Sequence, residues 1–189
     1  GAFADEGEHA GWLIFLFLGG MLTATALGQF QDSIEALSFL TLFIPLIIAS
    51  GGNSGSQAST LVIRAMAMDE VRLRDWWRVA RREIATGLAL GGVLGAIGFL
   101  RVVVFPGDVA NLGSNAVMLM GLTMTLSLLG VVLFGTLVGS MLPFLLRRAG
   151  LDPASASAPL VATLVDVTGL LIYFAAASYL LRGFFGPGL

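Results

Sequence analysis

Five long apolar segments constrain the fold of this chain more than any other feature of its sequence. A helix needs about 20 residues to cross a hydrocarbon core of about 30 Å, and each segment is close to or above that length. None of them alternates polar and apolar residues as the strands of an outer-membrane barrel do. We therefore predict an all-α integral membrane protein with five transmembrane helices, at residues 12–30, 37–66, 84–104, 116–146 and 157–181.

The composition agrees with a membrane protein and excludes several functions. Of the 189 residues, 57% are apolar and only 12% are charged, and the net charge is −2. Such a weak charge gives no basic field for nucleic acid. Cysteine is absent, which removes disulfides, thiolate metal sites and cysteine nucleophiles. Since the sequence also shows no nucleophile–base pair and no phosphate-binding loop, we do not predict an enzyme.

The arginines predict how the helices are oriented in the plasma membrane. Eight of the ten basic residues fall in two connections on the same side of the predicted bundle, and positive charge marks cytosolic loops. An odd number of spans then places the N-terminus in the cytosol and the C-terminus outside. We also expect residues 69–83 to form a separate amphipathic helix on the cytosolic surface, with Trp76 and Trp77 at headgroup depth. The eight arginines are Arg64, Arg72, Arg74, Arg78, Arg81, Arg82, Arg147 and Arg148.

The second apolar segment contains the stretch GGNSGSQAST, residues 51–60. Ten small or polar residues cannot face lipid as an unwound backbone, because its amide groups would lack partners there. We predict that this stretch breaks the second helix and lines an ion site, as broken helices do in transporters. The alternative is that its polar side chains only join neighbouring helices.

Asp166 is the one acidic residue predicted to lie deep in the membrane. It is nine residues from Ser157, about 13 Å into the hydrocarbon core. A carboxylate at that depth costs about 2.5–3.5 kcal/mol on insertion scales, so it should face the protein interior or water. Ala162 and Gly169 share its helical face and leave room beside it. The alternative is a protonated Asp166 that is hydrogen-bonded to Thr163 or to a neighbouring carbonyl.

Asn53 and Asp166 are predicted to lie at depths that differ by several ångströms, which suits a hydrated cation contacted at two levels. Ligands that are all oxygen atoms indicate a hard cation. Mg²⁺ keeps its waters and commonly takes only one or two carboxylates. One Asp per chain is few for a pore, so we expect a homodimer with two Asp166 carboxylates across its axis.

Two stretches resemble the signature motifs of MgtE-type magnesium channels: PLIIASGGNSGSQASTLVIRAMA (45–67) and DPASASAPLVATLVDVTGLLIYF (152–174). The resemblance extends over the whole chain, including the span count and the loop charges. It implies a homodimeric Mg²⁺-selective channel with its pore carboxylate at Asp166. Where family members usually read Arg-Gly-Leu-Ala after the second span, this chain reads Arg-Ala-Met-Ala, and we expect little consequence for the pore.

The resemblance also assigns roles to other residues. Ala162 would offer its carbonyl to the hydrated ion, Asn53 would lie near the same site, and Thr163 of the same motif is a further candidate metal-site residue. Asp32 and Glu35 resemble the cation-attracting outer entrance of the family. The cytosolic N-terminal and CBS domains of the family, which regulate the channel, are absent from this sequence. Residues 1–11 would then be the stub of the helix that connects those domains to the pore domain, residues 12–189.

Three functions remain open at this point. The first is passive Mg²⁺ conduction past Asp166. The second is a proton-coupled secondary transporter of divalent cations, in which Asp166 takes up a proton in alternation with the cation. The third is a membrane anchor in which Asp166 is only a packing group.

Overall fold

The computed structural model of this chain describes residues 2–184, and no strand occurs in that range. Within it, five segments are long and apolar enough to cross a membrane, which confirms the predicted all-α class and the number of spans. The long helices are α1 (Ala2–Gly28), α3 (Ile44–Ala67), α4 (Trp76–Val104), α5 (Ser114–Arg148) and α6 (Pro153–Leu180). The short elements are α2 (Gln31–Ala36), η1 (Ser38–Phe43), η2 (Leu73–Asp75) and η3 (Gly107–Leu112), of which the last three are 3₁₀ helices.

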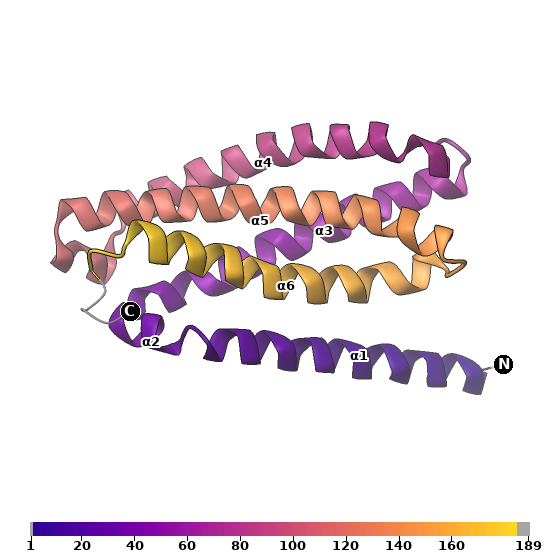
Figure 1. Cartoon of the computed structure of the whole chain (residues 1–189), viewed down its shortest axis with the longest axis horizontal. Coiled ribbons are helices and arrows are strands. Elements are labelled where there is room, and N and C mark those ends of the chain that lie inside the picture. Colours follow the sequence, from indigo (N-terminus) through magenta and orange to yellow (C-terminus); the bar gives the residue numbers. More distant parts are fainter. Residues whose placement is uncertain (1, 185–189) are drawn as a thin grey trace.

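Helix α5 is the centre of the bundle (Figure 1). It packs against α3, α4 and α6, and α3 and α6 also pack against each other. Helix α1 lies along the outside of the bundle, where its main contact is with α6. Because the connections between α3 and α4 and between α5 and α6 are short, consecutive long helices run in opposite directions.

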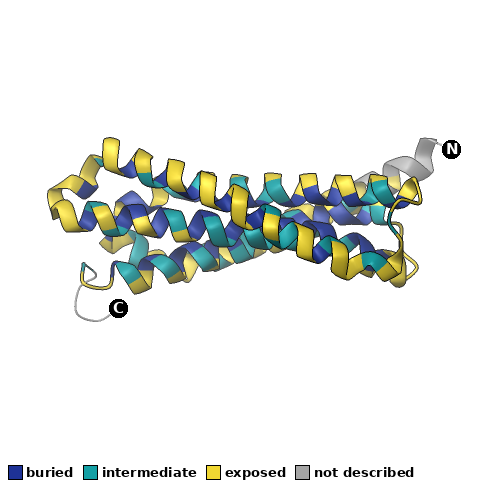
Figure 2. Ribbon diagram, turned by 90° about the horizontal axis from the view of Figure 1, so that it is seen from above, coloured by how far each residue is buried: buried dark blue, intermediate teal, exposed yellow. Residues whose placement is uncertain are grey.

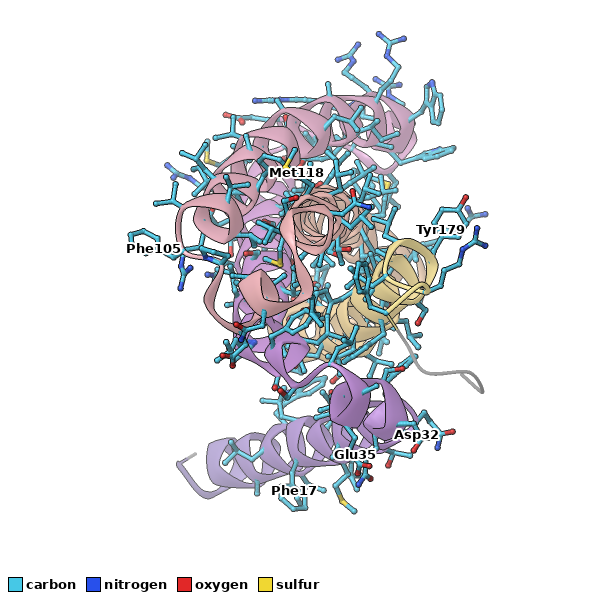
Figure 3. The ribbon with its side chains drawn as sticks, turned by 90° about the vertical axis from the view of Figure 1, so that its left-hand side faces the viewer. Phe17, Asp32, Glu35, Phe105, Met118 and Tyr179 are labelled. Atoms are coloured by element: carbon cyan, nitrogen blue, oxygen red, sulfur yellow. The ribbon has the colours of Figure 1, made fainter. Side chains whose placement is uncertain are left out.

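Most helices are buried on one side and exposed on the other (Figure 2), and many of the exposed residues are large and apolar. Tyr173 and Phe174 of α6 are fully buried with Met120 and Met124 of α5. Outward-facing residues include Phe17, which is 71% exposed and points away from the bundle in Figure 3. In a membrane such faces lie against lipid tails, which are as apolar as the side chains themselves.

The two ends of the bundle differ in charge. The first residues of α1 lie at the same end as the α3–α4 and α5–α6 connections, and the C-terminal end of α6 lies at the opposite end (Figure 1). Eight of the ten arginines lie in these two connections or in the helix turns next to them, and they therefore share one end of the bundle, as the sequence indicates. That this end faces the cytosol remains a prediction. The first residue of the predicted stub, residues 1–11, lies outside the described residues. From Ala2 onward the stub forms the first turns of α1.

The predicted break in the second span is wrong. Residues 51–60 lie inside the uninterrupted helix α3, so their backbone amides are paired within the helix. Their small side chains instead let helices approach closely: a Cβ atom built on Gly135 of α5 would lie 2.5 Å from the carbonyl oxygen of Gly51. Irregular backbone occurs earlier, in η1, whose residues precede α3.

The separate amphipathic helix predicted at residues 69–83 is also not found. The chain turns after α3, forms the single 3₁₀ turn η2, and then enters α4 at Trp76. Trp76 and Trp77 are both exposed in the first turn of α4. Residues 76–83 are therefore the first two turns of a transmembrane helix, because nothing in their sequence stops the helix before the apolar part begins.

Tyr173 joins the C-terminal half of α6 to η1, and its removal should lower stability. Its buried hydroxyl donates a hydrogen bond of 2.8 Å to the carbonyl oxygen of Leu40. We expect Tyr173→Phe to cost about 1 kcal/mol, the usual size for such bonds in membrane proteins, measured as a lower thermal midpoint in detergent. The control is Tyr179→Phe, since Tyr179 is 72% exposed; equal midpoints for the two variants would contradict the role of the bond.

Candidate functional site

Asp166 lies midway along α6, where its side chain is half-buried. On either side of Asp166, α6 contacts a neighbouring helix. Val161 and Val165 contact α3, since Cβ atoms built on Gly55 and Gly51 would lie 2.6 and 2.5 Å from their methyl groups. On another side, Thr163 packs against α1. Helical spacing places Asp166 and Ala162 on the face of α6 between these two contacts.

The Asp166 carboxylate has no charged neighbour and no hydrogen-bond donor among the described residues. The alternative in which Thr163 bonds to Asp166 therefore finds no support in this part of the chain. Thr163 instead fills the contact with α1, where a Cβ atom built on Gly19 would lie 2.9 Å from its methyl carbon. A carboxylate at this depth without a protein partner is costly unless water or a cation reaches it.

Ala162 lies about one helical turn from Asp166, toward the arginine-rich end, and is half-buried. Farther along the same direction, Pro159 lies inside α6. Because proline has no backbone N–H, the carbonyl oxygen of Ser155 lacks its usual helical donor. The first turns of α6 thus contain a backbone oxygen that lacks its i+4 donor, and the Asp166 carboxylate lies farther along the same helix.

Asn53 is exposed on α3. The contacts of Gly51 with Val165 and of Gly55 with Val161 place it level with Thr163. Since three residues of helix rise about 4.5 Å, Asn53 and Asp166 lie at nearby depths. However, Asn53 is two residues, or more than half a turn, from both glycines and so faces away from α5 and α6. Packing within one chain therefore brings the two residues to similar depth but not into contact.

Asn53 belongs to a polar face of α3 that the sequence analysis overlooked. Four exposed residues lie on this face, at spacings of three and four: Asn53, Ser56, Gln57 and Thr60. The last three line a shallow hollow of about 440 Å³. The helical spacing was present in the sequence, but reading residues 51–60 as a break concealed it. Within a membrane, a polar helix face requires protein or water against it.

Asp32 and Glu35 are exposed on α2, at the end of the bundle opposite the arginine-rich connections. In Figure 3, which views this end, both side chains lie on the outer surface of the same short helix. The Glu35 carboxylate accepts a hydrogen bond of 3.0 Å from the Gln31 side chain. The two carboxylates can therefore attract cations to this end of the protein.

Within residues 2–184, no cluster of three or more His, Cys, Asp or Glu side chains could hold a metal ion. Asp166, midway along α6, therefore has no two further side chains of these types around it among the described residues. Residues of this kind fit a hydrated cation, held through its waters, better than a dehydrated ion in a complete ligand cage.

Comparison with known proteins places these residues in a family. The family model MgtE, described as "Divalent cation transporter", matches residues 44–176, which include α3 and most of α6. The chain is similar to the "Magnesium transporter MgtE" of Thermus thermophilus, with 46% identity over 90% of this chain. It is 33% identical to the protein of that name from Enterococcus faecalis and 30% identical to that from Bacillus subtilis, over 92% and 88% of this chain. It spans about a third of the length of each relative, 35–36%.

Proposed function

The chain belongs to the MgtE family, and on that premise we propose that it forms a homodimeric channel that conducts hydrated Mg²⁺ across the plasma membrane. The family description and the relatives' names concern divalent cations and magnesium. The observation that carries the proposal for this chain is Asp166, a half-buried carboxylate in the middle of a membrane helix with no protein partner among the described residues.

A second copy of the chain would complete the site. The polar face of α3, which includes Asn53 and Gln57, is exposed in a single chain, and exposure to lipid would be unfavourable. A two-fold dimer that covers this face would enclose a polar path and place two Asp166 carboxylates near its axis. Mg²⁺ could then stay hydrated while two negative charges balance its own.

Each predicted site residue has a part in this mechanism. Asp32 and Glu35 raise the local concentration of cations at the outer entrance. Asp166 attracts the ion electrostatically and accepts hydrogen bonds from its waters. The Ala162 carbonyl and the Asn53 side-chain oxygen accept further hydrogen bonds from the hydration shell at a level nearer the arginine-rich end. Thr163 holds α1 against α6 and thereby fixes the direction of the neighbouring carboxylate.

The match to the Thermus thermophilus protein covers only 36% of that relative's length. We propose that cytosolic regulatory domains, attached before this chain's first residues, act on the channel through the N-terminal part of α1. The N-terminus would then be cytosolic and the C-terminus external, as the arginines predict.

The test is Mg²⁺ uptake into liposomes that contain this chain and a Mg²⁺-sensitive dye, without a pH gradient. A channel should take up Mg²⁺ down its concentration gradient and give single-channel currents in a planar bilayer. Uptake that requires a proton gradient, without such currents, would support the proton-coupled transporter instead. Empty liposomes give the background leak.

A further inference from the structure

A cavity lies at the arginine-rich end, between the start of α4 and the end of α5. Its volume is about 640 Å³. Trp76, at the first position of α4, forms one wall, and Met141, Phe144 and Leu145 of α5 form the other. It is well separated from Asp166, which lies at the middle of α6, so ion conduction leaves this cavity unexplained.

Two arginines give the cavity a charge. Arg74 reaches it from η2 and Arg148 from the last position of α5, and no carboxylate lines it. The nearest acidic residue in sequence, Asp75, accepts a hydrogen bond of 3.0 Å from the backbone N–H of Arg72. Asp75 makes no side-chain hydrogen bond to cap α4. The positive end of the α4 dipole therefore adds to the two guanidinium groups.

The apolar wall of the cavity continues onto the lipid-facing surface. Leu145 is 62% exposed and Trp76 is 50% exposed, whereas Phe144 is buried behind them. A tryptophan at the end of a transmembrane helix is typical of headgroup depth. The cavity thus combines a cationic rim with an apolar floor that opens toward the acyl chains.

We propose that this cavity binds an anionic phospholipid of the inner leaflet. Its phosphodiester would lie between Arg74 and Arg148, and an acyl chain would cover Leu145 and Met141. Charge complementarity favours this occupant over a zwitterionic lipid, because a headgroup without net charge would leave the two guanidinium groups uncompensated. The site depends on the membrane embedding and orientation proposed above, but not on the ion that the protein conducts.

The test uses Trp76 as a local reporter of lipid contact. In a Trp12→Phe, Trp77→Phe background, Trp76 is the remaining tryptophan. The protein is reconstituted in phosphatidylcholine vesicles with a small fraction of brominated phosphatidylglycerol or, in parallel, of brominated phosphatidylcholine. Brominated acyl chains quench tryptophan on contact, so we expect stronger quenching by the anionic lipid at equal fraction.

Removing the two cavity arginines should abolish this preference. At about 1 kcal/mol per arginine near the membrane surface, Arg74→Gln with Arg148→Gln should weaken the relative affinity for phosphatidylglycerol about thirtyfold. The matched control is Arg78→Gln with Arg81→Gln, which removes the same charge from exposed residues outside the cavity. The control pair should retain most of the preference.

Three results would overturn the proposal. One is equal quenching by the two lipids in the parent protein, and another is an equal loss of preference in the two arginine pairs, which would indicate diffuse surface attraction. The third is relief of quenching by inorganic phosphate alone, which would show a site for a free anion rather than a lipid. Since none of these measurements uses Mg²⁺, their failure is distinguishable from failure of the channel proposal.

Discussion

Replacing Asp166 by Asn should reduce Mg²⁺ uptake into liposomes at least tenfold and remove selectivity for divalent over monovalent cations. The substitution keeps the size of the side chain and its ability to bond to water but removes the charge. Two unit charges about 4 Å apart attract by about 1 kcal/mol even in bulk water, and a divalent ion doubles this value. Since about 1.4 kcal/mol corresponds to a tenfold change in binding, occupancy of the site should fall by at least that factor.

The control for this experiment is Thr168→Val, which removes a polar group from the same helix two residues away. Thr168 is half-buried, like Asp166, but helical spacing places it on a different face of α6. Uptake by Thr168→Val should equal that of the parent protein. If Asp166→Asn also retained full uptake and selectivity, Asp166 would be a packing residue and the ion path would lie elsewhere.

The sequence was sufficient to predict the number of transmembrane helices, because span length and polarity are properties of each segment alone. The position of Asp166 within a long apolar helix could be predicted too, since one carboxylate in an apolar segment is conspicuous without any neighbour. The clustering of the arginines at one end could be predicted for a similar reason, since it requires only that consecutive helices run in opposite directions.

Residues 51–60 could not be interpreted correctly without the neighbouring helices. Glycine and serine are poor helix formers in water, but in a membrane bundle the same residues allow close packing. The backbone of α3 stays helical because its Gly51 and Gly55 lie against Gly135 of α5. No property of the stretch itself distinguishes this arrangement from a broken helix; the difference lies in residues some 80 positions away.

Whether Asn53 and Asp166 face each other also depends on the neighbouring helices. Counting residues from each end of a span gives depth, and the structure agrees that the two lie at similar levels. Direction around the helix axis depends on which neighbours each helix contacts. For Asn53 that direction points away from its own bundle, so the proposed ion site depends on a second copy that no single-chain pattern can place.

The contact between α3 and α5 should be the most sensitive packing position in the protein. A Cβ atom built on Gly139 would overlap the carbonyl oxygen of Gly55 and lie 2.8 Å from its Cα atom. These are backbone atoms, which cannot move aside as a flexible side chain could. We therefore expect Gly139→Ala to force the two helices apart at a cost of about 3 kcal/mol, at the upper end for overpacked cores, measured by chemical or thermal unfolding in detergent.

Gly92→Ala provides the matched comparison, because a Cβ atom there would meet nothing within 4 Å. Alanine is favoured over glycine within a helix by up to about 1 kcal/mol, so this variant should be as stable as the parent protein or slightly more stable. The same chemical change should thus have opposite effects in two transmembrane helices. Equal stability of the two variants would mean that α3 and α5 are not in backbone contact in the membrane. In that case the polar face of α3 would no longer be held in the position from which a second copy could complete the site.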